Sequence, residues 1–336
     1  MNKFVKVLLI IAACLAGLGV LTTAFGVYWS VRVADRLLPD EAVKQTLAVD
    51  VNALRDVRID TGVSELRFET VPASEARVET SGFTEGEVEL GQQDGVLTVR
   101  SRSVLGDGDL INLGIFRIDW LGRIHTGTLQ PRTVTVYLPP TALDSFELNA
   151  GVGAVSGALP FSAQRMDISC GTGSVALRDL QAQQLHVSRG VGSVTLTDFA
   201  CEMFSLTGGT GVATLTNGGA SVRADVSVGV GNVTVDGGDW NALSVEGGAG
   251  SFVFDGSLRG VCSIEGGVGR TELRFADAAD NYEVQIQKGV GDIDVKGAEL
   301  VLLGDDNFAV NPGAGAANLL TIDQGAGAVK LRFPEE

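Results

Sequence analysis

The sequence predicts an all-β fold, a parallel β-solenoid (β-helix) with coils of about 19 to 20 residues, preceded by one N-terminal transmembrane helix. Three features of the 336-residue chain support this prediction. A Gly-x-Gly triplet recurs at an almost constant interval, apolar residues alternate with polar ones around each triplet, and an uncharged apolar segment lies near the N-terminus.

The triplets account for an unusual glycine content. The chain has 45 glycines but only 8 prolines, which is neither a collagen-like nor a disordered composition. Eight triplets follow one another at intervals of 20, 19, 19, 20, 19, 19 and 22 residues: Gly151-Val152-Gly153, Gly171-Thr172-Gly173, Gly190-Val191-Gly192, Gly209-Thr210-Gly211, Gly229-Val230-Gly231, Gly248-Ala249-Gly250, Gly267-Val268-Gly269 and Gly289-Val290-Gly291. A period near 20 residues is typical of a solenoid, in which each coil stacks only on its neighbours.

Each repeat contains two strand-like segments with one inward-facing side. Five positions before the second glycine every repeat has an apolar residue: Leu148, Ile168, Val187, Leu206, Val226, Val245, Ile264 and Ile286. Two positions after it the residues are again mostly apolar: Val155, Val175, Val194, Ala213, Val233, Phe252, Thr271 and Ile293. The period of two within each segment predicts one half-buried strand on either side of the triplet.

The inward-facing residues lie at odd distances from the second glycine before the triplet and at even distances after it. A corner or a bulge at the triplet must therefore absorb one residue. Glycine suits such a position because it reaches positive φ and lets neighbouring coils approach closely. A phosphate-binding loop is the other interpretation of Gly-x-Gly, but it requires a helix after the glycines. Strand-like sequence follows all eight triplets, which favours coil corners over a nucleotide site.

Residues 7–31 form the predicted transmembrane helix. They contain no charged residue and exceed the roughly 20 residues that cross a bilayer core as a helix. Lys3 and Lys6 precede the segment, so the positive-inside rule leaves the N-terminus in the cytoplasm and places the C-terminal domain outside the cell. Two alternatives remain open: cleavage after Ala24 as a signal peptide, and lipidation of Cys14.

The chain divides into four predicted regions. Residues 1–31 form a cytoplasmic stub with the signal-anchor helix, and residues 32–50 form a stalk. Residues 51–145 form an N-terminal β region, and residues 146–336 form the Gly-x-Gly solenoid. Within the N-terminal region, residues 105–130 lack periodicity and are interpreted as an insertion.

Near the C-terminus the repeat becomes irregular. The segment around Gly325-Ala326-Gly327 fits the template again, but Gly313-Ala314-Gly315 lies only 12 residues before Gly327 and breaks the period. Terminal repeats of a solenoid are expected to be atypical because they cap its open ends.

Composition and charge exclude several classes of function. The formal net charge of -16 gives no electrostatic footprint for nucleic acid. With two histidines, His125 and His186, and no Cys-x-x-Cys pair, the chain offers no pattern for a zinc site or a thiol-redox site. We expect no cofactor, no metal and no catalytic residue, and we expect Cys170, Cys201 and Cys262 to be buried free thiols.

Asp and Asn recur where each coil closes, as in Arg178-Asp179, Thr197-Asp198 and Thr216-Asn217. Stacked coils would place these side chains roughly 4.8 Å apart along one edge. Such a ladder could bind Ca²⁺, but Asp and Asn are also ordinary turn residues, and turn chemistry is the favoured interpretation.

Several blocks resemble a known family. Val-Thr-Val-Tyr-Leu-Pro-Pro at 134–140, Phe-Glu-Leu-Asn-Ala-Gly-Val-Gly at 146–153, and the Gly-Val-Gly-Asx-Val-x-Val units at 229–235 and 289–295 resemble the bacterial putative-adhesin family of uncharacterised glycine-rich β-solenoid domains. The resemblance covers roughly residues 50–333. It implies a membrane-anchored protein of the cell surface or envelope, with no catalytic residues to carry over.

The sequence therefore predicts a binding protein and not an enzyme. The leading hypothesis is an adhesin that presents a rigid, acidic solenoid surface to a cell-surface or glycan ligand, with residues 7–31 in the lipid bilayer. The first alternative is an accessory protein that senses stress in the cell envelope or braces it. A glycan-cleaving β-helix enzyme is the weaker alternative, because no pair of outward carboxylates with a matched base stands out.

Overall fold

The computed structural model describes residues 38–39, 43–101, 109–112, 116–119, 124–126 and 131–335. The chain separates into two compact units, one of residues 1–42 and 103–130 and the other of residues 43–102 and 131–336. The predicted transmembrane segment, residues 7–31, lies outside the described residues. Among the residues that are described, no helix is long and apolar enough to cross a membrane.

The smaller unit contains a four-stranded sheet. Its strands are β1 (Leu38–Pro39), β8 (Asp109–Asn112), β9 (Phe116–Asp119) and β10 (Ile124–Thr126), in the order β1-β10-β9-β8. β8, β9 and β10 pair antiparallel, and β1 pairs parallel with β10. The stretch 105–130, in which the sequence shows no periodicity, therefore contains three short strands.

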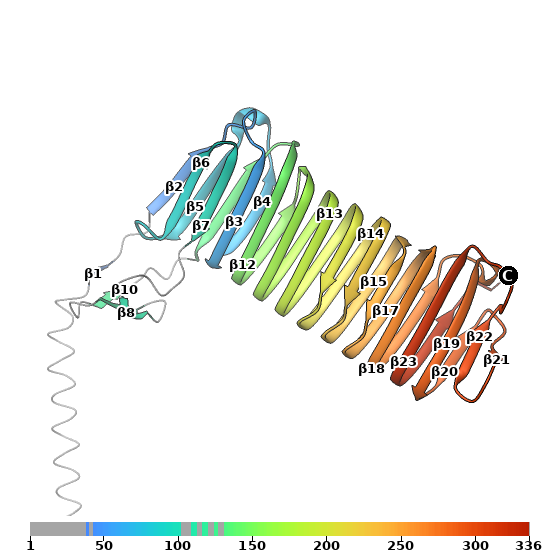
Figure 1. The fold of residues 1–336 in the computed structure, drawn as a ribbon. Coiled ribbons are helices and arrows are strands. Elements are labelled where there is room, and N and C mark those ends of the chain that lie inside the picture. Colours follow the sequence, from blue (N-terminus) through green and yellow to red (C-terminus); the bar gives the residue numbers. More distant parts are fainter. Residues whose placement is uncertain are drawn as a thin grey trace, which may run out of the picture. The chain divides into compact units, whose positions relative to one another are not determined.

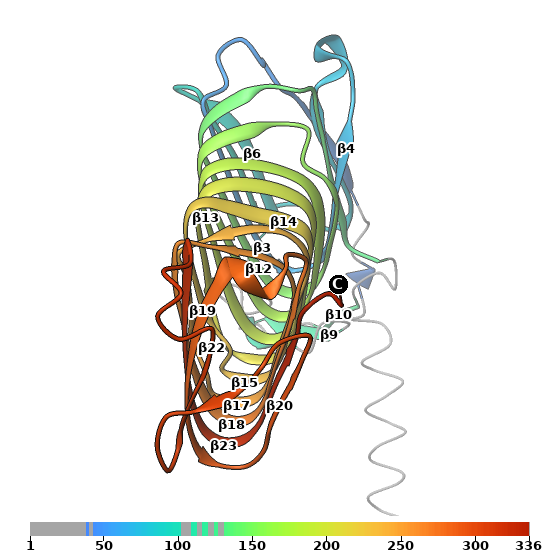
Figure 2. The same ribbon diagram turned by 90° about the vertical axis from the view of Figure 1, so that its right-hand side faces the viewer.

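The larger unit is a stack of β-coils, seen from the side in Figure 1 and along the stack in Figure 2. Its main strands are β12 (Ala142–Ala158), β13 (Ser162–Thr207), β14 (Thr210–Ser227), β15 (Val230–Asn241), β16 (Leu243–Glu246), β17 (Ala249–Arg259) and β18 (Val261–Phe275). All pairings between these strands are parallel and join residues one repeat apart. The predicted all-β solenoid fold is thereby confirmed.

Antiparallel strands close the N-terminal end of the stack. β3 (Asp56–Val63) and β4 (Glu65–Thr70) form the first coil, on which β12 stacks. On the other side, β7 (Val96–Ser101) pairs parallel with β3, and β11 (Thr133–Leu138) pairs parallel with β4. The outer strands β2 (Val43–Ala48), β5 (Arg77–Phe83) and β6 (Val88–Gln93) then pair antiparallel, and a short 3-10 helix, η1 (Ala73–Glu75), precedes β5.

At the C-terminal end the spatial order of the coils differs from the chain order. β19 (Tyr282–Val290) and β20 (Ile293–Lys296) do not stack on β18; the final strand, β23 (Asn318–Arg332), lies between them and β18. The chain skips one level through η2 (Ala279–Asn281), turns back through β21 (Val301–Leu302) and β22 (Asn307–Val310), and then fills the skipped level. This return explains why Gly313-Ala314-Gly315 breaks the period.

The core consists of the inward residues that the repeat predicts. The eight residues five positions before the second glycine, from Leu148 to Ile286, are all at most 2% exposed. At the position two residues after it, every residue is at most 3% exposed except Ile293, which is half-buried. Ile293 belongs to β20, and among the described residues no strand stacks beyond β20 on that side.

The triplet glycines are required by the stacking of the coils. The second glycine of each triplet has φ between 135° and 155°, with Gly250 as the exception. A Cβ on Gly171 would lie 2.6 Å from the carbonyl oxygen of Gly151 in the preceding coil, and Gly192 and Gly211 would meet backbone oxygens in the same way. Any larger residue would push neighbouring coils apart, which confirms the prediction that glycine at the triplets reaches positive φ and lets the coils approach closely.

Candidate functional site

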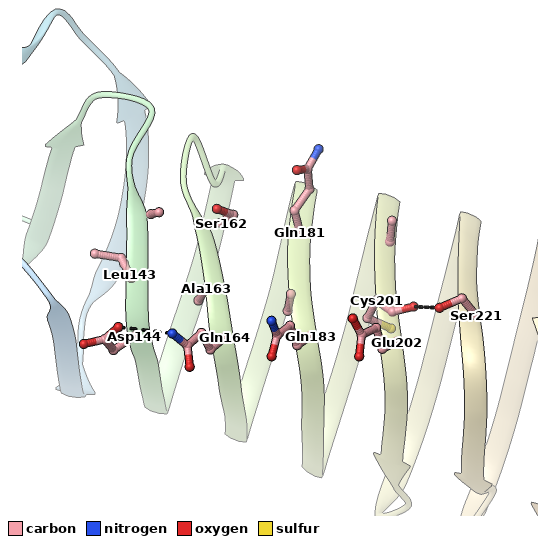
Figure 3. A pocket seen from close by; sticks show the side chains of 13 residues that line it. Leu143, Asp144, Ser162, Ala163, Gln164, Gln181, Gln183, Cys201, Glu202 and Ser221 are labelled. Atoms are coloured by element: carbon pink, nitrogen blue, oxygen red, sulfur yellow. Dashed lines mark hydrogen bonds between the residues drawn. The ribbon is translucent and has the colours of Figure 1, made fainter.

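A groove of about 510 Å³ runs along one corner of the solenoid, across the coils of β12, β13 and β14 (Figure 3). It lies where each coil turns from the second strand segment of one repeat to the first segment of the next. Its lining residues are Ala142, Leu143, Asp144, Ser162, Ala163, Gln164, Gln181, Ala182, Gln183, Ala200, Cys201, Glu202 and Ser221.

Apolar side chains at one phase of the repeat, most of them small, form the floor of the groove. Leu143 in β12 is in register with Ala163 in β13, and Ala182 and Cys201 follow at the same phase in the next two coils. Leu143, Ala163 and Cys201 are buried, while Ala182 is half-buried. The floor is therefore apolar, and the small side chains of Ala163, Ala182 and Cys201 leave the corner hollow.

A ladder of four polar side chains lines the groove. Asp144, Gln164, Gln183 and Glu202 occupy one phase in four successive coils, and all four are exposed. Figure 3 shows them in a row along the corner, and the Gln164 side-chain amide donates a 3.3 Å hydrogen bond to Asp144. The two amides can each donate and accept hydrogen bonds, while the two carboxylates at the ends only accept.

A second hollow, of about 210 Å³, adjoins the groove on the same side of the coils. Its residues directly follow the ladder in the chain: Arg165, Asp167, Gln184, Leu185, His186, Met203, Phe204, Ser205, Arg223 and Asp225. Gln184 and His186 lie between the two arginine-bearing coils, and Met203 is 41% exposed there. Ladder and hollow thus form one continuous polar surface over successive coils.

Two ion pairs form the ends of this hollow. Arg165 Nε lies 2.6 Å from Asp167 Oδ2, and Arg223 contacts both carboxylate oxygens of Asp225 at 2.7 Å. In each pair the hydrogen bond to the aspartate raises the pKa of the guanidinium. Because each positive charge is matched by a carboxylate two residues away, the hollow presents hydrogen-bonding groups without an excess of positive charge.

The histidines and the described cysteines lie at different places in the described part of the chain. His186 lies in the hollow, whereas His125 lies in β10 of the other unit. Cys170, Cys201 and Cys262 are free and buried, as predicted. Burial raises the pKa of the Cys201 thiol to about 12, so this groove residue is a poor nucleophile near neutral pH.

The turn residues that suggested a calcium ladder have backbone conformations that explain them without a metal. Asp179, Asp198 and Asn217 all have φ between 50° and 60°, the left-handed region that Asp and Asn tolerate better than most residues. The Asn217 amide donates a hydrogen bond to Asp198. Within the described part of the chain, no group of three or more His, Cys, Asp or Glu residues is placed to hold a metal ion.

The groove residues were not identified as a site from the sequence. A signal was present, because Asp144, Gln164, Gln183 and Glu202 are spaced like the glycine triplets and each directly follows an apolar residue. That signal does not distinguish a ligand-binding ladder from an ordinary solvated face. The groove can be recognised only from the three-dimensional structure, which shows how deep the surface is at this corner.

The fold and groove define this protein as a β-solenoid with a polar, ligand-sized corner groove. A family model described as Toastrack DUF4097 matches residues 46–301, which is more than half of the chain. The protein therefore belongs to the Toastrack DUF4097 family, and the family resemblance predicted from the sequence is confirmed. No curated protein matches the chain.

Solved structures of low sequence identity are also similar to this chain. A putative adhesin from Bacteroides fragilis is 12% identical, with a TM-score of 0.42, and the match covers 88% of this chain and 99% of that one. A putative adhesin from Parabacteroides distasonis is 11% identical, with a TM-score of 0.43 and coverage of 88% and 99%. A putative lipid binding protein from Parabacteroides distasonis is 10% identical, with a TM-score of 0.40 and coverage of 88% and 98%.

Proposed function

We propose that this protein is an extracytoplasmic adhesin, held in the membrane by residues 7–31, that binds a glycan in the corner groove. The observation that carries the proposal is the ladder of Asp144, Gln164, Gln183 and Glu202 along an open groove. Parallel coils repeat these side chains at about 4.8 Å. A ligand that repeats its own hydrogen-bonding groups along its length matches such a ladder.

The chemistry of the groove favours a neutral, hydroxyl-rich polymer. The side-chain amides of Gln164 and Gln183 can pair with hydroxyl groups as donors and as acceptors. Asp144 and Glu202 at the ends, together with a net charge of -16, disfavour polyanions. A peptide has no strand edge to join here, because the groove strands already pair with a neighbour on each side.

The spacing of the carboxylates favours binding without cleavage. Asp144 and Glu202 are three coil steps apart, which is roughly 14 Å at about 4.8 Å per step. Glycosidase carboxylate pairs are about 5 to 9.5 Å apart. The groove acids therefore suit hydrogen bonding to a ligand better than paired acid–base chemistry.

The proposal is tested by reconstituting the full chain in lipid vesicles and measuring vesicle retention on immobilised polysaccharides, neutral and acidic. We expect saturable retention on a neutral glycan and at least a tenfold loss with Gln164→Ala/Gln183→Ala, because two hydrogen-bonding side chains leave the ligand. Ala182→Phe, which fills the groove without removing a polar group, should give a similar loss.

The matched control changes two exposed glutamines of β19, Gln285→Ala/Gln287→Ala, which lie outside the groove. This control should retain full binding. Equal loss in the control and the groove variants, or no retention on any glycan, would contradict the proposal. Preference for acidic polysaccharides would reject the charge argument.

A further inference from the structure

The middle residues of the triplets, together with Val63 of the first coil, form a continuous ridge along another corner of the solenoid, and all of them are exposed except the half-buried Ala326. In spatial order the ridge is Val63, Val152, Thr172, Val191, Thr210, Val230, Ala249, Val268, Ala326 and Val290. Its valines are 41% to 79% exposed. Because mostly glycines flank these residues, their side chains stand alone above the backbone.

From Val152 onward the ridge alternates without exception between valine and a residue that is smaller or more polar. The order is Val, Thr, Val, Thr, Val, Ala, Val, Ala, Val. The alternation is hidden in the sequence, where Gly267-Val268-Gly269 and Gly289-Val290-Gly291 are consecutive valine triplets. It appears in space because β23 inserts Ala326 between Val268 and Val290.

We infer that the ridge is a self-association surface, and that its occupant is the ridge of a second copy of this chain in antiparallel orientation. When the ten-residue ridge is reversed and laid on itself, Val152 faces Ala326, Thr172 faces Val268, Val191 faces Ala249, and Thr210 faces Val230. Each valine projection then meets a threonine or an alanine, and only the terminal pair, Val63 with Val290, is valine on valine. A two-fold axis between the Thr210 and Val230 levels makes the contact isologous and closed.

The charges beside the ridge are compatible with the antiparallel orientation. Four residues before the second glycine, the side chains in spatial order are Asp60, Asn149, Ser169, Ser188, Thr207, Ser227, Glu246, Glu265, Asp323 and Gln287. Three acids therefore occupy adjacent levels in the C-terminal half. In the antiparallel pair the two-fold axis is perpendicular to the ridge, so this row faces its own copy in reverse order.

The antiparallel pair matches every acid of this row with a neutral partner. Glu246 faces Ser188, Glu265 faces Ser169, and Asp323 faces Asn149, so each carboxylate gains a hydroxyl or amide donor. Asp60 at the other end faces Gln287. The valine alternation thus selects the antiparallel orientation, because an in-register parallel pair would set each valine against its own copy, and the charged row is compatible with it.

The size of the ridge predicts a weak dimer. Nine coil steps of about 4.8 Å make it roughly 43 Å long, but it is one side chain wide. Such an interface belongs to the small, transient class, below about 1,200 Å². The chain enters the stack at β2, at its N-terminal end, so the two chains of the antiparallel pair enter it from opposite ends.

Site-specific disulfide formation tests both the contact and its orientation. Thr172→Cys and Val268→Cys are made separately in the full chain with Cys14→Ser, and the two purified proteins are mixed in detergent under mild oxidation. The described native cysteines are buried and will not contribute. We expect a covalent dimer from the mixture and none from either protein alone, because each residue lies about 24 Å from its own copy in the antiparallel pair.

A second pair of variants separates a specific contact from random collision. Val191→Lys/Val230→Lys, placed in both proteins, should lower the cross-linking rate at least tenfold, whereas Val261→Lys should not. Val261 is 69% exposed and lies off the ridge. Cross-linking within Thr172→Cys alone, or equal cross-linking in all variants, would overturn the inference. Glycan retention that persists in Val191→Lys/Val230→Lys leaves the groove proposal standing independently of this result.

Discussion

Replacing Ile322 by alanine tests the out-of-order C-terminal coil. Ile322 is fully buried in β23, in register with Ile264 of β18 on one side and Ile286 of β19 on the other. In chain order β23 would be a terminal coil, and weakening it would affect only the end of the stack. In the observed order β19 and β20 depend on β23 for their attachment.

The expected magnitude follows from the burial of the side chain. Isoleucine to alanine in a packed core costs about 2 to 5 kcal/mol. A loss of about 3 kcal/mol raises the population of the locally open state roughly a hundredfold, since about 1.4 kcal/mol corresponds to a factor of ten. Because coils of a solenoid contact only their neighbours, this loss should stay at the C-terminal end.

Native-state hydrogen exchange of the full chain measures this effect. We expect amides of β19 and β20 to exchange faster by the same factor as those of β23, while amides of β13 keep their protection. Ile168→Ala, equally buried but in β13, is the matched control and should leave β19 and β20 unchanged. Faster exchange in β23 with full protection in β19 would refute the inserted position of β23.

Three further predictions concern single contacts. Tyr282→Phe should cost about 2 to 3 kcal/mol in chemical denaturation at pH 7, because the buried hydroxyl donates to Asp277 at 2.9 Å. Burial alone would raise the pKa of Asp277, but hydrogen bonds from neighbours including Tyr282 lower it. The stabilisation that the ionised Asp277 gives the fold is present above the unfolded pKa near 3.9 and is lost as pH falls through the lower folded pKa. The loss of stability caused by Tyr282→Phe should therefore shrink in acid. Cys201 should resist alkylation at pH 8 in the native state and react after unfolding, because burial raises its pKa to about 12. Gly269→Ala should destabilise the fold by about 2 to 4 kcal/mol, measured by denaturant titration, because its Cβ would meet the carbonyl oxygen of Gly250.

Each of these predictions has a distinct contrary result. A cost of Tyr282→Phe that is equal at pH 7 and in acid would disconnect the hydroxyl from Asp277. Rapid labelling of native Cys201 would mean that the groove floor opens to solvent. Gly313→Ala is the control for Gly269→Ala, since a Cβ at Gly313 meets no atom within 4 Å. The φ of 71° at Gly313 adds backbone strain of its own. If Gly313→Ala lowers the free energy of unfolding as much as Gly269→Ala or more, the stacking argument is rejected.

Arg189 shows how far tertiary contacts can depart from the local pattern. Its side chain is 2% exposed and donates to the backbone oxygens of Gly211 and Val228 at 3.1 and 2.8 Å. Burial lowers the pKa of this guanidinium. In the next coil the corresponding position is Gly208, which has no side chain. The buried guanidinium is therefore held by backbone oxygens of later coils, contacts that a single repeat does not reveal.

The sequence by itself determined the coils and their core. The inward positions from Leu148 to Ile286, the corner at each Gly-x-Gly and the turns at Asp179 and Asp198 follow from local rules. A period of two places side chains on alternate faces, and glycine or Asp in tight positions reflects backbone sterics. These properties depend on a few adjacent residues and recur in each coil, so the repeated pattern makes them recognisable in the sequence.

Only the tertiary structure decided which levels are neighbours and where the surface is hollow. The place of β23 depends on the free energy of filling a skipped level, which involves residues as distant as Ile264 and Ile322. The groove depends on the depth left by small side chains in several coils at once. The alternating ridge exists because Ala326 lies between Val268 and Val290. Contacts between distant segments determine all three, and local periodicity does not encode such contacts.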